Sequence, residues 1–147
     1  MSLKTQIEEQ IKESLKAGQK ERLSALRMLL AAVKNDEIAK QKEASDEDVV
    51  SVVQKQIKQR RESIEIYDKA GRDELAAIER GEIEVLSKFL PQQLSEEDLK
   101  NVVREVVSSL PDNERNNFGK VMSQTMSKVK GQSDGSSVSR IVKEILG

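Results

Sequence analysis

Apolar residues recur along the chain at steps of three and four, the spacing that places side chains on one face of an α-helix. Ser2 can cap the start of a first helix, and Gly18 can end it. The apolar stripe of this helix consists of Leu3, Ile7, Ile11 and Leu15. A second helix is predicted over residues 21–35, with Ile38 extending its apolar face. Its stripe is the broadest, so we expect this helix to be the most buried.

Two further helices are predicted between Ser45 and Pro91. Ser45 followed by Asp48 resembles a capping box with a shorter acid, and the third helix then runs to Gly71, over about 37 Å at 1.5 Å per residue. The fourth helix begins near Arg72 and stops at Pro91. The apolar positions of the two helices are Val49, Val50, Val53, Ile57, Ile64, Tyr67, Leu75, Ile78, Ile83, Leu86, Phe89 and Leu90.

Residues 91–147 are predicted to form a second domain of three helices. A hinge over residues 91–99 leads into a capping-box-like start at Ser95 and Asp98, and residues 110–117 form a loop. The apolar stripes are Leu99, Val102, Val103, Val106, Val107 and Leu110, then Phe118, Val121, Met122, Met126 and Val129, then Val138, Ile141, Val142, Ile145 and Leu146. The predicted fold is all-α, with a four-helix up-and-down domain at 1–90 followed by a small three-helix domain at 91–147.

Histidine and cysteine are absent from the 147 residues, which removes imidazole bases, thiolate nucleophiles, disulfides and the usual zinc ligands. The 25 basic residues nearly balance the 26 acidic ones, so an anionic partner must be met by a local patch. No apolar run is long enough for a signal peptide or a membrane span. These features predict a soluble, cytoplasmic protein that works by binding, with no catalytic residue, metal, cofactor or membrane partner.

The stretch from residue 115 to residue 133 contains no acidic residue, although charges alternate elsewhere in the chain. Its basic residues are Arg115, Lys120, Lys128 and Lys130. Gly119 lies at the predicted start of the sixth helix, where backbone N–H groups and the positive helix end can receive a phosphate. The alternative is structural, because Gly131 can cap this helix while Lys128 and Lys130 complement its negative end. The stretch is therefore a candidate nucleic-acid interface.

Three other features have mainly structural interpretations. A basic run on the third helix could hold phosphates, but Glu62 and Glu65 follow it closely and a solvated helix surface explains the same residues. This run consists of Lys55, Lys58, Arg60 and Arg61. Residues 132–137 lack the spacing and the lysine of a phosphate-binding loop, so they are predicted to form a turn with an N-cap. Met122 and Met126, one turn apart, are assigned to the core.

Four blocks of the sequence, at residues 21–35, 58–75, 84–99 and 118–146, closely resemble the YqeY family. A relative of that family is the helical tail of GatB, the B subunit of the tRNA-dependent amidotransferase, and related tails are attached to some glutaminyl-tRNA synthetases. The resemblance implies a four-helix domain followed by a three-helix domain, and contact between the tail and tRNA. It also brings an association with carbon–nitrogen ligase activity that uses glutamine as amido-N-donor, for which these residues provide no catalytic site.

The resemblance also points to particular residues in the second domain. The positions that match the family are Gly119, Lys120, Val121, Met122, Lys128, Gly131, Asp134, Gly135 and Val138. The chain departs from the family at Gln132, where a basic residue is common, and at Ser139, where Asn is common. From the acid-free stretch and the resembling block at residues 118–146, the candidate RNA-binding residues are Arg115, Gly119, Lys120, Lys128, Lys130 and Arg140.

Three functions are compatible with the sequence. The first is an accessory tRNA-binding module, acting alone or beside an amidotransferase or an aminoacyl-tRNA synthetase. The second is an enzyme, which requires a pocket with paired, pKa-shifted groups that the sequence does not supply. The third is a helical protein–protein interaction module that uses an apolar groove between the two domains, which would form an exposed apolar patch. The tRNA-binding module is the prediction, and the interaction module is the alternative.

Overall fold

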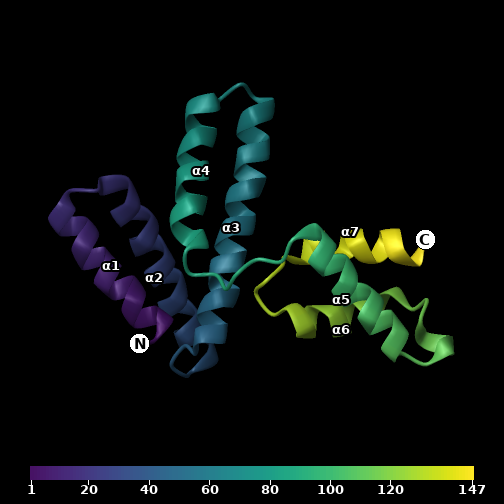
Figure 1. Cartoon of the computed structure of the whole chain (residues 1–147). Helices are drawn as coiled ribbons and strands as arrows, with labels where there is room; N and C mark the ends of the chain where they lie inside the picture. Colours follow the sequence, from purple (N-terminus) through teal and green to yellow (C-terminus); the bar gives the residue numbers. More distant parts are fainter. The chain divides into compact units, whose positions relative to one another are not determined.

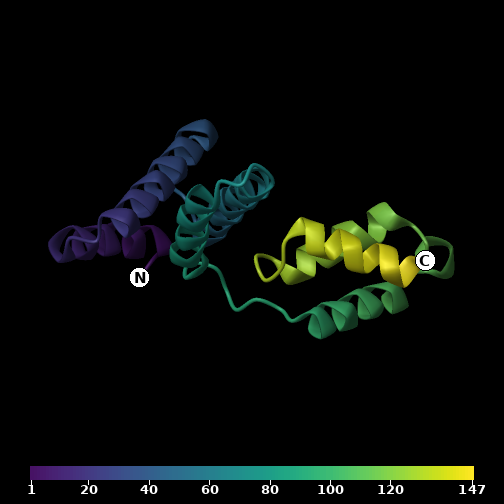
Figure 2. The same cartoon turned by 90° about the horizontal axis from the view of Figure 1, so that it is seen from above.

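The computed structural model describes all residues 1–147 and contains only helices, which confirms the predicted all-α class and the seven α-helices. The chain divides into two compact units, Met1–Leu90 and Pro91–Gly147 (Figures 1 and 2). None of the helices has the length and apolar character that a bilayer span needs. The elements are α1 (Leu3–Ala17), α2 (Lys20–Lys40), α3 (Asp46–Lys69), α4 (Asp73–Ser87), α5 (Glu96–Ser109), the short 3-10 helix η1 (Asp112–Glu114), α6 (Phe118–Val129) and α7 (Gly135–Leu146).

The first unit consists of two antiparallel hairpins, α1/α2 and α3/α4, which are inclined to each other (Figure 1). Helix α2 packs against each of the other three helices of the unit. It also contains more buried residues than any other helix, as expected for the broadest apolar face. These are Leu23, Ala25, Leu26, Leu29 and Val33.

The core of this unit lies where the two hairpins meet, and two expected members of it are exposed. Leu15 is 59% exposed because steps of four residues turn 40° further each time, so the stripe that begins at Leu3 has left the core face by Leu15. Ile38, expected to extend the α2 stripe, is 74% exposed near the end of that helix. The buried core consists of Ile7, Leu26, Leu29, Val33, Val49, Val53, Ile57, Leu86 and Phe89.

Few side chains are buried at the end of the α3/α4 hairpin where the turn joins the two helices. The last buried residue of α3 is Arg60, nine residues before the helix ends at Lys69. Leu75 and Ile78 of α4, both predicted as core positions, are 40% and 49% exposed. Figure 1 shows the reason, since this end of the hairpin extends past α1 and α2 and has no third helix to cover it.

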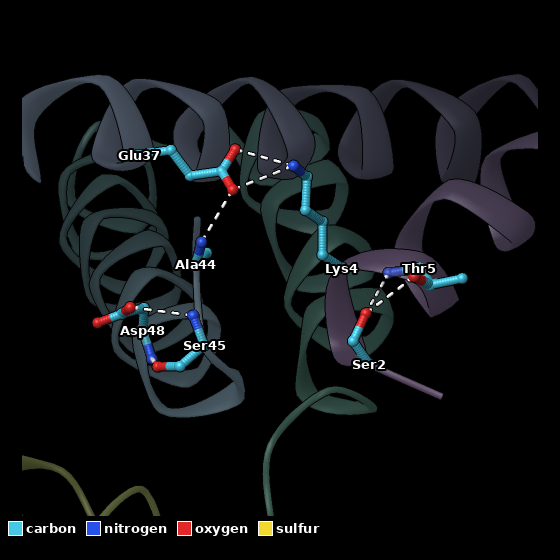
Figure 3. A network of polar contacts seen from close by, with 7 residues as sticks. All are labelled: Ser2, Lys4, Thr5, Glu37, Ala44, Ser45 and Asp48. Atoms are coloured by element: carbon cyan, nitrogen blue, oxygen red, sulfur yellow. Dashed lines mark hydrogen bonds and ion pairs between the residues drawn. The ribbon is translucent and has the colours of Figure 1, made fainter. Parts of the chain in front are cut away.

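Side-chain hydrogen bonds cap the starts of α1 and α3 at the predicted residues (Figure 3). The Thr5 N–H donates to the hydroxyl of Ser2 at 3.1 Å, and Gly18 ends α1 in the left-handed conformation, with φ of 69°. At the start of α3, the N–H of Asp48 donates to the hydroxyl of Ser45 at 3.1 Å and the N–H of Ser45 donates to the Asp48 carboxylate at 3.0 Å. The predicted capping box is therefore present in full.

Glu37 joins three segments of the first unit (Figure 3). The ammonium of Lys4 on α1 donates to both carboxylate oxygens of Glu37 on α2, at 2.9 and 3.0 Å. The N–H of Ala44, in the connection to α3, donates to the same carboxylate at 2.8 Å. These two contacts, the Ala44 N–H first, hold the pKa of Glu37 below its ordinary value.

In the second unit, α5, α6 and α7 pack against one another around a core that is almost entirely aliphatic. Ser95 accepts from the N–H of Asp98 at 3.1 Å, and Asp134 accepts from the N–H of Ser137 at 2.7 Å, so α5 and α7 have side-chain caps at the predicted places. The buried residues of this core are Leu99, Val103, Val106, Leu110, Val121, Val129, Val138, Ile141 and Val142. Met122 and Met126 pack against it, which confirms their assignment.

The segment that precedes α5 is partly held to the second unit. The N–H of Leu94 donates to the carbonyl of Gln132 at 2.9 Å, and the side chain of Gln93 donates to the carbonyl of Gly131 at 2.8 Å. The sequence predicts a hinge over residues 91–99, whereas these bonds fix the segment from Gln93 onward. Pro91 and Gln92, which precede these two hydrogen bonds, are exposed.

Candidate nucleic-acid interface

Helix α6 presents two lysines that have no partner within the chain. Val121, Thr125 and Val129 are buried one turn apart, and they fix the face of α6 that packs on the core. Lys120 and Lys128 are exposed, and neither ammonium makes a hydrogen bond or an ion pair. An exposed cation without a carboxylate partner can accept a phosphate without first losing an ion pair. Lys130 is also exposed and follows directly after the helix.

Asn117 determines what the start of α6 can bind. Its side-chain oxygen accepts from the N–H of Lys120 at 3.0 Å, so one of the free N–H groups predicted to receive a phosphate already has an acceptor. Gly119 is the second residue of the helix, and a Cβ atom there would meet only the Asn117 oxygen, at 3.6 Å. Packing does not require a glycine at this position, which leaves the surface beside it open.

Arg115 is occupied by the end of α5. Its guanidinium donates to the carbonyls of Leu110 and Ser108, at 2.9 and 3.2 Å, and forms an ion pair with Asp112 at 3.1 Å. These bonds satisfy carbonyl groups that have no partner within the helix. A phosphate would have to compete with all three contacts, so Arg115 acts first as a structural residue.

Arg140 is also paired, in this case between α7 and α5. Its guanidinium lies 2.6 Å from the carboxylate of Glu96 and 3.4 Å from that of Glu144. The bond from Arg140 lowers the pKa of Glu96 and raises that of Arg140 itself. Of the six candidate residues, therefore, Lys120 and Lys128 are unpaired cations on one helix, while Arg115 and Arg140 each make ion pairs elsewhere in the unit.

Phe118 is not part of the predicted interface, because the apolar stripe of the sixth helix predicts that it lies on the core face. The structure leaves it 40% exposed, and it is not among the side chains packed against the core. The ammonium of Lys143 on α7 lies 5.9 Å from the centre of its ring. Helical spacing to Val121 and Met122 suggested burial, but Phe118 is the first residue of α6, where no further turn covers it.

The solvated surface predicted for the basic run of α3 does not hold for Arg60. Lys55 and Lys58 are exposed, as a solvated surface predicts, but Arg60 is only 5% exposed. Its guanidinium donates to Glu82 of α4 at 2.7 Å. The signal was present, because Arg60 follows Ile57 by three residues and continues the buried face of α3.

The helical fold places this chain in the class of all-α proteins, and no group of three or more acidic, histidine or cysteine side chains is arranged to hold a metal ion. The chain matches the Yqey-like protein family over residues 4–146 and belongs to that family. The match covers nearly the whole chain, in agreement with the resemblance seen in its four sequence blocks.

Fungal relatives extend this comparison. The "Altered inheritance of mitochondria protein 41, mitochondrial" of Pyrenophora tritici-repentis is 27% identical over 140 residues, which cover 93% of this chain and 77% of the relative. An uncharacterised protein of Schizosaccharomyces pombe is 33% identical, over 64% of this chain and 76% of its own length. The Saccharomyces cerevisiae protein of the same name as the first is 33% identical over 68% of this chain, and the match spans only 56% of that relative.

The predicted cytoplasmic location is wrong by this comparison. The relatives from Pyrenophora tritici-repentis and Saccharomyces cerevisiae both carry the word mitochondrial in their names. The location was inferred from the lack of a signal peptide and of a membrane span, and neither absence distinguishes the cytoplasm from the interior of an organelle.

Proposed function

We propose that this chain is an accessory tRNA-binding module and that α6 provides its phosphate contacts. The observation that carries the proposal is the pair of exposed, unpaired lysines, Lys120 and Lys128, on a helix without acidic residues. Residues 115–147 contain six basic and two acidic side chains, and one of those acids, Glu144, is paired with Arg140. Such a local excess of positive charge attracts phosphates although the whole chain has a net charge of −1.

The resemblance to the GatB tail supports tRNA as the partner and supplies a role for a protein without catalytic groups of its own. In this proposal the chain delivers or positions tRNA, and an amidotransferase or an aminoacyl-tRNA synthetase carries out the chemistry. The association of the family with glutamine-dependent carbon–nitrogen ligation then describes the partner's reaction.

The test is the dependence of tRNA affinity on salt. Phosphate contacts release counterions, so the affinity of the unmodified chain should fall steeply between low and physiological salt. The double substitution Lys120→Ala and Lys128→Ala should weaken binding and make the log–log slope shallower by about one unit for each lost contact. Helicity should be unchanged, because both side chains are exposed and unpaired.

A matched control exists on α3, where Lys55 and Lys58 are also exposed. Lys55→Ala with Lys58→Ala removes the same charge and should leave the salt slope as it is. If binding follows this control pair instead, the interface lies on the first unit. If the unmodified chain binds no tRNA at low salt, the accessory-module proposal is wrong.

The alternative function, protein–protein interaction, has one observation in its favour. Ile66, Leu75 and Ile78, near the turn of the α3/α4 hairpin, are 66%, 40% and 49% exposed. Leu75→Ser with Ile78→Ser should leave the core of the first unit intact, since neither residue belongs to it. Loss of co-sedimentation with a purified amidotransferase in this variant, with tRNA affinity retained, favours the interaction module.

A further inference from the structure

Phe118 begins α6 beside Lys143 of α7, and its exposure calls for a specific explanation. The chain has only three aromatic residues, two Phe and one Tyr. Phe89 is buried in the first core, whereas Phe118 is 40% exposed and lies outside the second core. Burial of an aromatic ring is strongly favourable, so an exposed ring that contributes to no core is available for a ligand.

The surroundings of the ring define the ligand chemistry. Lys143 lies over the ring with its ammonium 5.9 Å from the centre, at the outer limit of a cation–π contact. Gly119, which follows Phe118, has no side chain to limit approach. An aromatic surface next to a cation complements a flat π-system attached to a phosphate, which is the description of a nucleotide.

We infer that Phe118 is a stacking platform for an unpaired nucleobase, with Lys143 near a phosphate beside that base. This inference rests on the proposed RNA-binding function and names the part of the RNA that is recognised. A base within a duplex has both faces covered by its neighbours, so only a loop, bulge or single-stranded end can stack on the ring. The site therefore selects single-stranded nucleotides, and Lys120 and Lys128 contact the backbone elsewhere on α6 without regard to sequence.

The competing explanation is that Phe118 shields the edge of the core between α6 and α7 and holds Lys143 in place. The two explanations differ in what a substitution does. If the ring only shields the core, Phe118→Leu should change stability and leave RNA affinity alone. If the ring stacks on a base, Phe118→Leu should leave the fold intact and weaken tRNA binding by about 5- to 150-fold, while Phe118→Tyr should retain affinity.

The absence of tryptophan from the chain allows a direct measurement. Phe118→Trp introduces a single indole at the site, and its fluorescence should be quenched by a short unstructured RNA strand and not by the same strand annealed to its complement. Tyr67→Trp, on α3 of the first unit, is the matched reporter away from the site and should respond to neither RNA.

The outcomes separate this inference from the proposed function. Quenching at position 118 by the single strand alone, together with weakened binding by Phe118→Leu, supports base stacking. Lysine-dependent tRNA binding without quenching, and with full affinity in Phe118→Leu, overturns the stacking inference and leaves the proposed function standing. Absence of any tRNA binding by the unmodified chain removes both.

Discussion

Arg60 and Glu82 form an ion pair between α3 and α4 that should contribute strongly to the stability of the first unit. The Arg60 Nε lies 2.7 Å from a carboxylate oxygen of Glu82, and the two side chains are 6% and 18% exposed. The same guanidinium donates to the carbonyl and the side-chain oxygen of Gln56, at 3.1 and 2.7 Å. Arg60 is therefore almost fully desolvated, and Glu82 is its carboxylate partner.

Glu82→Ala leaves this buried charge with Gln56 as its polar partner. Breaking a fully buried pair costs about 3–5 kcal/mol, and losing one hydrogen bond to a charged group costs about 1.5–3 kcal/mol. Because Gln56 remains and Glu82 is partly wetted, we expect a loss of about 2–4 kcal/mol in the free energy of unfolding. Glu82→Gln keeps the shape and one acceptor, and should cost about half as much.

A second pair of the same length provides the control. Arg80 of α4 and Asp68 of α3 also approach to 2.7 Å, but their side chains are 55% and 45% exposed. An exposed pair contributes at most about 1 kcal/mol because water and salt screen it, so Asp68→Ala should cost that much or less. Urea denaturation followed by far-ultraviolet circular dichroism measures both variants. If Glu82→Ala costs no more than Asp68→Ala, burial does not control the strength of this pair and the reasoning is wrong.

Three further predictions concern acid, base and proteolysis. Burial, and after it the charge of Glu82, raises the pKa of Glu79. The folded state therefore loses stability as pH rises above the ordinary carboxyl pKa. Glu79→Gln should raise the melting temperature at neutral pH, and the difference should vanish in acid. Hydrogen bonds from Ser45 and Lys40 lower the pKa of Asp48, so the stability that Asp48 contributes above its ordinary pKa is lost as pH falls. Asp48→Asn should be less stable than the unmodified chain at neutral pH and should lose less stability on acidification. An unchanged acid transition in this variant would contradict the prediction. Limited proteolysis should cut first at residues 91–92, because the hydrogen bonds of Gln93 and Leu94 protect the residues that follow. The products should be two helical fragments. Resistance at this site would count against separable domains.

The start of each helix was easier to predict than its burial. Ser2, Ser45 and Ser95 each accept a hydrogen bond from an N–H three residues ahead, so the cap depends on a few neighbouring residues that the sequence displays directly. The apolar stripes likewise indicated which faces carry the two cores. The stripes did not indicate where packing stops, and Leu15, Ile38 and Phe118 are exposed although each belongs to a predicted stripe.

The candidate interface, too, could be predicted from the sequence only in part. The acid-free stretch identified the exposed lysines of α6, since the local balance of charge is a property of the sequence alone. The pairing of Arg140 with Glu96 could not be predicted in this way, because the two residues are 44 positions apart and meet only when α7 packs on α5. The role of Arg115 at the end of α5 depends similarly on the path of the loop that contains η1.

Composition and hydrogen bonds between near neighbours can be read from the sequence, and they establish that this chain is helical, where its capped helices begin, and that it lacks histidine and cysteine chemistry. Which charges are free to bind and which are used internally depends on how the helices pack. A charge is satisfied or left available according to what a distant helix places beside it. Arg60 is thus buried against Glu82, whereas Lys120 and Lys128 remain open to solvent.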